Sequence, residues 1–172
     1  MTKIHIIGSI GSGKTTVARW LAKELAIPHY ELDNVVWQRS AAGDVRRSVE
    51  QRDDKLAAIL SRGEWIIEGV HYKWLEPSFQ AADIILYLDT PYKKRRARII
   101  KRFIKQKLGI EEANYKPSFR IAKTLYQYNK RFDYGERDNI FKTLKPFHSK
   151  VVIYRDSKDV LNKGSDFLKL FK

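Results

Sequence analysis

The feature that most constrains the fold is an eight-residue segment near the amino terminus, Gly8-Ser9-Ile10-Gly11-Ser12-Gly13-Lys14-Thr15. It fits the pattern G-x-x-x-x-G-K-[ST], which is informative where a strand precedes it and a helix follows it. The β-branched run from Lys3 to Ile7 predicts such a strand. Apolar residues at helical spacing from Lys14 to Ala26 predict the helix. The chain is therefore expected to begin as strand, glycine loop and helix.

This loop has the chemistry of a triphosphate site. Its backbone N–H groups are expected to point inward at an anion, and the start of the following helix adds its positive end. Lys14 then reaches the β- and γ-phosphates of a nucleotide such as ATP, and the Thr15 hydroxyl ligates Mg²⁺. The residues expected to bind the nucleotide here are Gly8, Gly11, Ser12, Gly13, Lys14, Thr15 and, as phosphate support or helix surface, Thr16.

Four more short apolar runs predict strands: His29 to Leu32, Trp65 to Ile67, Ile84 to Leu88, and Lys150 to Tyr154. Acidic residues bound several of these runs, as expected for buried parallel strands whose ends reach a polar site. Helical segments separate them. The pattern predicts an α/β fold with an open parallel sheet covered on both faces, and a site at the carboxyl ends of the strands.

Three segments between and after these strands are predicted to be helical. Residues 44–61 carry apolar side chains at near-helical intervals, and Gly63 follows as a stop signal. Residues 91–149 are rich in Arg, Lys, Tyr and Phe and are expected to form a helical insertion rather than a second core, with breaks at Gly109, Pro117 and Gly135. A last helix is expected through Val160, Leu161, Phe167 and Leu168.

Length and composition exclude several classes of protein. With 172 residues, the chain has the size of one domain, so we expect a single functional module over residues 1–172. The absence of cysteine excludes disulfides, thiolate metal sites and a cysteine nucleophile. No apolar run reaches the roughly 18 residues of a membrane span, and the first one leads into glycines rather than a cleavage site. We therefore expect no membrane partner and a cytoplasmic location.

The net charge of +14 is concentrated in one third of the chain. Residues 91–150 hold 18 lysines and arginines against 5 acidic residues, whereas residues 1–90 hold 11 basic and 12 acidic residues. A segment of this kind is expected to meet an anionic partner: nucleotide phosphates, a nucleic acid backbone or an acidic membrane surface. The alternative is a solvated helical face that contributes only to solubility.

These segments resemble the small P-loop nucleoside and nucleotide kinases of the adenylate kinase-like group. Within that group the chain is most similar to the FlaR-like proteins labelled DNA topology modulation proteins. The phosphate loop specifies only the superfamily, and the segments Tyr30 to Trp37 and Trp65 to Val70 are more particular. The other matching segments are Ala82 to Pro91, Lys105 to Gly109 and Asn114 to Phe119.

The resemblance implies a three-layer α/β/α P-loop NTPase fold with strand order 2-3-1-4-5 and a mobile helical lid, inserted at about residues 92–149. In related kinases, arginines of the lid contact ATP, and the spacing from Pro91 is similar for Arg98 and Arg102. Guanidinium groups closing over the phosphates stabilise the charge of phosphoryl transfer. Arg131 and Arg137 are expected to close from the far side of the insertion.

The resemblance also implies two carboxylates near the phosphates. Asp33 follows the second strand, where related kinases place an acid that holds the acceptor hydroxyl or a Mg²⁺-bound water; a turn or helix-cap role is the alternative. Glu68 follows the third strand and would act on Mg²⁺ through water or as a base for the acceptor. The expected catalytic residues are thus Lys14, Asp33, Glu68, Arg98 and Arg102, and the expected metal site is Thr15, Asp33 and Glu68.

Together these features predict an ATP- and Mg²⁺-dependent phosphotransferase acting on a nucleotide, a nucleoside or another small acceptor. The stretch after Gly69 reads Val-His-Tyr, unlike adenylate kinases, which argues against AMP as the acceptor. One alternative is a DNA-associated regulator that binds nucleotide as a switch, supported by the basic segment but by no named DNA-binding motif. The other is a nucleotide hydrolase, which would release phosphate without a phosphorylated product.

Overall fold

The computed structural model describes residues 2–40, 43–110, 118–164 and 168–169 and contains a five-stranded parallel sheet. Its strands are β1 (Lys3–Gly8), β2 (His29–Glu31), β5 (Trp65–Gly69), β6 (Ile84–Leu88) and β7 (Val151–Tyr154). They lie side by side in the order β2-β5-β1-β6-β7. Counted along the chain, this is the order 2-3-1-4-5, so the expected topology is confirmed.

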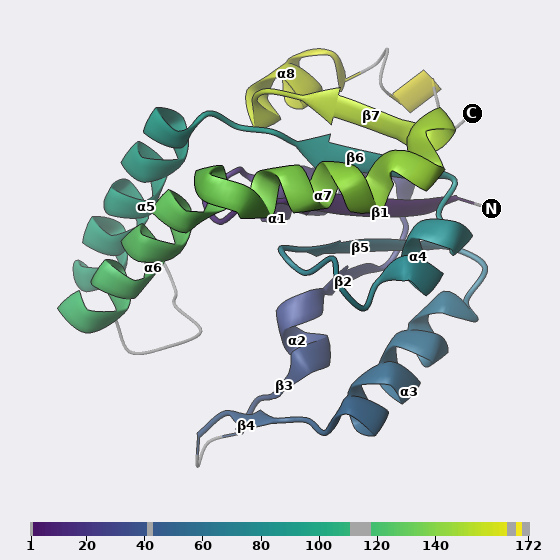
Figure 1. The fold of residues 1–172 in the computed structure, drawn as a ribbon, viewed down its shortest axis with the longest axis horizontal. Coiled ribbons are helices and arrows are strands. Elements are labelled where there is room, and N and C mark those ends of the chain that lie inside the picture. The colour runs from purple at the N-terminus through teal and green to yellow at the C-terminus, as the bar shows by residue number, and fades with distance from the viewer. Residues whose placement is uncertain (1, 41–42, 111–117, 165–167, 170–172) are drawn as a thin grey trace.

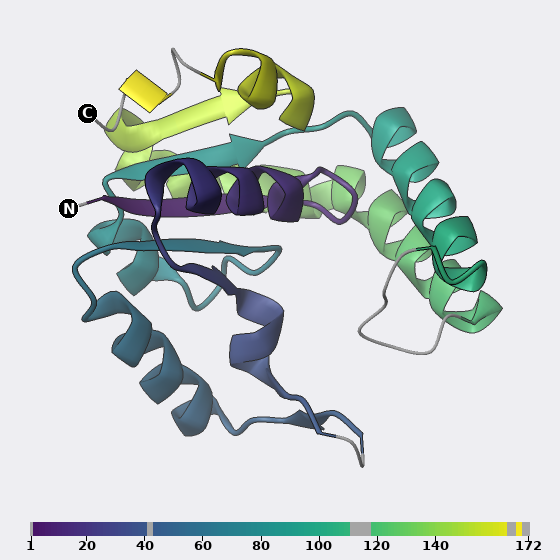
Figure 2. The same ribbon diagram turned by 180° about the vertical axis from the view of Figure 1, so that it is seen from behind.

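Helices cover both faces of this sheet, as Figures 1 and 2 show from opposite sides. Alternation along β1 sends Ile4 and Ile6 to one face, where they pack with residues of α1 (Lys14–Leu25) and α8 (Ser157–Asn162). Ile7 points to the other face and joins a second buried cluster. That cluster includes residues of α3 (Val49–Leu60), α4 (Glu76–Ala81) and α7 (Arg137–Leu144). The three-layer α/β/α arrangement is therefore confirmed.

The segment after β2 differs from the expected strand and helix. The strand ends at Glu31, and Leu32–Val36 form the short helix α2. A small hairpin follows, made of β3 (Trp37–Gln38) and β4 (Val45–Arg46). The helix predicted over 44–61 begins only at Val49, because Ser48 accepts a hydrogen bond from the Gln51 N–H at 3.1 Å and its own N–H donates to the Gln51 side chain. This reciprocal cap fixes the start of α3.

The predicted insertion is helical and has two parts. Helices α5 (Tyr92–Lys107) and α6 (Phe119–Arg131) form a two-helix arm beyond the carboxyl ends of the strands (Figure 1). After it come η1 (Phe132–Glu136), α7 and η2 (Lys145–Lys150). Phe132, Ile140 and Leu144 are buried against the sheet, so this second part belongs to the helical layer of the core. The expected break at Pro117 lies outside the described residues.

The last predicted helix is described only in part. Helix α8 ends at Asn162, and Phe167 lies outside the described residues. Within the described parts of the chain, no helix has the length and apolar character needed to cross a membrane.

A single buried arginine joins the arm to the core. The Arg95 side chain is 1% exposed, although it is a cation on a helix with many solvated charges. Its guanidinium donates to the Asn129 side chain at 2.7 Å, to the Thr90 carbonyl at 2.5 Å and to Asp133 at 2.9 Å. It also lies over the Phe132 ring, 4.8 Å from the centroid. Arg95 thus links α5 to the end of α6, to η1 and to the segment after β6.

We expect Arg95→Ala to lower the free energy of unfolding by about 3 kcal/mol, because it leaves the buried partners of the guanidinium without a donor. Urea denaturation measures this difference. The matched control is Lys93→Ala, an exposed position on the same helix, which should change stability by less than about 0.5 kcal/mol. Equal effects of the two substitutions would show that Arg95 does not hold the arm.

Candidate active site

The glycine loop closes between the end of β1 and the start of α1. The Ser12 N–H donates to the Ser9 carbonyl at 3.2 Å, which curls the loop. Gly13 then caps α1 with a φ of +97°, a left-handed conformation that favours glycine. A Cβ at Gly13 would also lie 2.4 Å from Ser157 Oγ. Both the backbone conformation and the close packing of the loop on α8 therefore require glycine at this position. Because no side chain caps α1, its first N–H groups stay available to an anion.

Lys14 is buried at the base of this loop. Its Nζ donates to the Ser9 carbonyl at 3.0 Å, and the residue is 8% exposed. Burial lowers the pKa of Lys14; the charges of Glu68 and Asp33 act in the opposite direction, and that of Arg102 acts with burial. An ammonium has three donors, so the contact with Ser9 leaves capacity for phosphate oxygens. A polyphosphate bound here would also compensate the cost of burying the cation.

Two of the three predicted metal residues lie in direct contact. Thr15, in the first turn of α1, donates its hydroxyl to Glu68 Oε1 at 2.6 Å, and Glu68 is 5% exposed near the end of β5. The third, Asp33, is exposed in the first turn of α2, where His71 Nε2 lies 3.8 Å from its carboxylate. The nearby His71 imidazole is the main reason why the pKa of Asp33 is lowered. Asp33 is therefore ionised and open to solvent at neutral pH.

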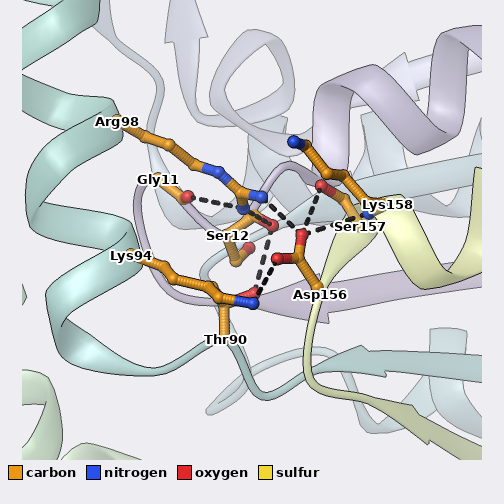
Figure 3. Close-up of polar contacts among 8 residues, drawn as sticks. All are labelled: Gly11, Ser12, Thr90, Lys94, Arg98, Asp156, Ser157 and Lys158. Atoms are coloured by element: carbon orange, nitrogen blue, oxygen red, sulfur yellow. Dashed lines mark hydrogen bonds and ion pairs between the residues drawn. The ribbon is translucent and has the colours of Figure 1, made fainter.

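Arg98 lies on the backbone of the phosphate loop (Figure 3). Its guanidinium donates to the carbonyl of Ser12 at 2.9 Å and to that of Gly11 at 3.4 Å. It also donates to Asp156 at 2.5 Å. The structure therefore brings Arg98 of α5 to the loop, where its hydrogen bonds go to loop carbonyls and to the segment after β7.

Asp156 is the acidic centre of this contact, and sequence reasoning did not single it out. It accepts hydrogen bonds from Lys94 at 2.7 Å and from the Lys158 N–H at 3.1 Å, in addition to Arg98 (Figure 3). Burial on its own raises the pKa of Asp156, but these three hydrogen bonds and the Arg98 charge outweigh it and hold the pKa well below its usual range. The signal in the sequence is similar to that for Glu68: an acidic residue at or just beyond the carboxyl end of a predicted strand.

The other predicted arginines occupy different surroundings. Arg102 is exposed on α5, close enough for its charge to lower the Lys14 pKa. Arg131 is exposed at the end of α6. Arg137 forms a two-point pair with Asp89, with distances of 2.8 and 2.6 Å. Arg102 is thus near the phosphate loop, whereas Arg137 is joined to the end of β6.

The remaining predicted residues complete the loop, and the set fits a nucleotide with Mg²⁺. Gly8 ends β1, and Thr16 is exposed on α1. Among the described residues, the buried Ser12 Oγ has no hydrogen-bond partner, and it lies so close to Gly8 that a Cβ there would be 2.9 Å from it. N–H groups without a side-chain cap at the start of α1, a buried ammonium and a hydroxyl paired with a carboxylate are groups that suit a magnesium–triphosphate complex.

Comparisons with known proteins agree with this geometry. A family model described as an AAA domain, AAA_18, matches residues 4–116. Shikimate kinase of Enterococcus faecalis is 27% identical over 147 residues, covering 77% of this chain and 83% of that protein. An uncharacterized Bacillus subtilis protein, YqaC, is 27% identical over 131 residues, covering 76% of this chain and 72% of its own.

A solved structure extends the likeness to nearly the whole chain. Shikimate kinase from Bacteroides thetaiotaomicron superposes with a TM-score of 0.56, covering 99% of this chain and 98% of that chain. Sequence identity in that comparison is 16%, so the likeness concerns the fold.

We expect Asp156→Asn to lower the free energy of unfolding by about 2 kcal/mol at pH 7, because the amide keeps the cap of α8 but loses the charge that Arg98 and Lys94 face. A carboxylate with a lowered pKa stabilises the fold above its unfolded-state pKa, so the difference from the wild type should shrink as the pH falls below about 4. Denaturation at several pH values between 7 and 3 measures this difference in the free energy of unfolding.

The matched control is Asp159→Asn, at an exposed position on the same helix, which should differ little from the wild type at every pH. A constant gap for Asp156→Asn would contradict this assignment.

Proposed function

Because the chain belongs to the AAA_18 family of AAA domains and is a P-loop protein of the adenylate kinase-like group, we propose that it is a kinase that uses ATP and Mg²⁺ to phosphorylate a small molecule. The observation that carries the proposal is the buried Lys14 ammonium, which donates to the Ser9 carbonyl of the glycine loop next to the Thr15–Glu68 contact. The 27% identity with a protein named shikimate kinase supports a small acceptor. We also assign the chain to the FlaR-like subfamily, on the segments Tyr30 to Trp37 and Trp65 to Val70.

The phosphate loop holds and orients the transferred group. Backbone N–H groups between Gly8 and Thr15 bind the β-phosphate, and Lys14 neutralises charge on the γ-phosphoryl group as it moves. Little covalent chemistry falls to the protein in this reaction, so positioning and electrostatic stabilisation supply most of the rate. The tight packing of Gly13 on Ser157 serves that purpose, because it fixes the loop before the nucleotide binds.

Thr15 and Glu68 are the residues that hold Mg²⁺ in this proposal, with Thr15 as a ligand and Glu68 through water. Bound there, Mg²⁺ neutralises charge on the phosphate oxygens. Asp33 receives the acceptor, since its carboxylate is exposed, ionised and near enough to Lys14 to influence the pKa of that side chain. An ionised carboxylate at this position orients the attacking hydroxyl and accepts its proton.

The arginines of α5 act in two ways. Arg98 holds the loop carbonyls and Asp156, which joins the arm to the nucleotide site. Arg102, one turn further along the helix and exposed, is the arginine we assign to the phosphates. We assign Arg131 to the arm as a residue that closes over the nucleotide. Arg137 is assigned to the edge of the site, where Asp89 holds it.

A DNA-associated regulator is the second candidate, and the basic surface of the arm favours it. Exposed cations on α5 and α6 include Lys93, Arg96, Lys101, Lys107, Arg120, Lys123 and Lys130. However, Arg95 and Arg98 of α5, and Arg137 of α7, are bonded within the fold, so part of the charge of residues 91–150 serves the structure. We favour the kinase for this reason.

The kinase proposal predicts a phosphorylated product. We expect the purified protein, incubated with ATP, Mg²⁺ and a panel of hydroxy acids, sugars, nucleosides and nucleotides, to phosphorylate at least one compound detectably by mass spectrometry. Lys14→Ala should lower the rate about 100-fold or more without unfolding the protein, because it removes a charged donor to the moving phosphoryl group. Lys23→Ala, an exposed lysine near the other end of α1, is the matched control and should leave the rate unchanged.

Phosphate release without any phosphorylated compound would indicate a hydrolase instead. No product at all, or equal rates for Lys14→Ala and the wild type, would contradict the proposal.

A further inference from the structure

A second group of polar side chains lies on the α1 face of the sheet, at its β2 edge. Successive residues of a strand point to opposite faces, so His29 and Glu31 share one face of β2. The parallel register places Glu31 beside Glu68 of β5 and His29 beside Ile66, which packs in the cluster under α1. The strands therefore place an imidazole and two carboxylates on the same side of the sheet.

These three side chains are close enough to share one ion. One ligand atom from each of His29, Glu31 and Glu68 lies within 4.8 Å of the other two. Glu68 is 5% exposed, and the Glu31 side chain is 21% exposed, so the group lies mostly out of solvent but reaches the surface through Glu31. His29 Nε2 is buried and has no hydrogen-bond partner among the described residues. Burying a ring nitrogen without a hydrogen-bond partner costs free energy. A metal ion would supply the missing partner once the ring turns this nitrogen toward Glu31 and Glu68.

The first two turns of α1 contact both carboxylates. Thr15 donates to Glu68 Oε1 at 2.6 Å, and Arg19 donates to Glu31 Oε1 at 3.3 Å. The Arg19 side chain is 70% exposed, so its contact with Glu31 is a weak surface pair that an ion would displace at low cost. Glu68, in contrast, is shared between this group and the phosphate loop.

We propose that His29, Glu31 and Glu68 bind a divalent transition-metal ion such as Zn²⁺ in the nucleotide-free protein. An imidazole nitrogen with two carboxylate oxygens suits Zn²⁺ and its neighbours, whereas Mg²⁺ prefers oxygen ligands and keeps most of its water. Bonds of about 2.0–2.2 Å draw the three ligand atoms somewhat closer together than they lie now, which side-chain rotation permits. This ion is distinct from the Mg²⁺ that accompanies ATP, because its site includes His29 and needs no phosphate.

The test is a Zn²⁺ titration of the full chain without nucleotide, followed by calorimetry and by NMR of the imidazole groups. The chain has 4 histidines, so the signals of His29 can be distinguished from those of His5, His71 and His148. We expect one Zn²⁺ per chain, with the His29 signals shifting and those of His148 unchanged. A tenfold excess of Mg²⁺ should not displace the ion.

Substitutions test the ligand set directly. His29→Asn and Glu31→Gln should each weaken Zn²⁺ binding at least tenfold, and His148→Asn, on an exposed histidine, should bind like the wild type. The NMR titration of the unaltered chain decides the matter even if a variant does not fold. No binding, or shifts at His71 or His148 in place of His29, would overturn the proposal. The Zn²⁺ titration contains no nucleotide. A failure of the zinc proposal can therefore be distinguished from a failure of the kinase proposal.

Discussion

The burial of the Lys14 ammonium in a closed loop of backbone is the interaction on which the rest of the structure depends. A lysine with 8% exposure and a carbonyl contact at 3.0 Å is costly to keep charged unless an anion arrives. The parallel sheet makes this arrangement possible, because β1 delivers the loop at the carboxyl edge and β5 brings Glu68 next to Thr15. The fold thus builds a site that favours the binding of a negatively charged group.

Two arginines of α5, the buried Arg95 and the partly buried Arg98, connect the basic arm to this site. Arg95 fastens the arm to the core through Asn129, Asp133 and the Thr90 carbonyl. Arg98, one turn along the helix, binds the loop carbonyl of Ser12 and the carboxylate of Asp156. Arg98 therefore ties α5 to the loop backbone and to the segment after β7.

Local patterns in the sequence were enough to predict the sheet, whereas long-range pairing was not visible in them. The glycine loop, its flanking strand and helix, and the apolar runs of β5 and β6 were all predicted from short stretches with strong signals. The strand order came from family resemblance. The helix predicted over residues 44–61 was wrong in its first turn, because the Ser48 cap and the pairing of Val45–Arg46 with β3 override the spacing of apolar residues. The contacts of Asp156 and Arg95 were missed, because their main side-chain partners are distant in the sequence: 58 residues separate Arg98 from Asp156, and 34 separate Arg95 from Asn129.

The central claim is that the loop from Gly8 to Thr15 binds the polyphosphate of a nucleotide, with Lys14 as its buried cation. Calorimetric titration of the protein with ATP in the presence of Mg²⁺ tests it most directly. The account predicts saturable binding of one ATP per chain, weakened at least tenfold in Lys14→Ala, since a hydrogen bond to a charged group contributes about 1.5–3 kcal/mol. Absence of binding to the wild type, or equal affinity for the variant, would contradict it.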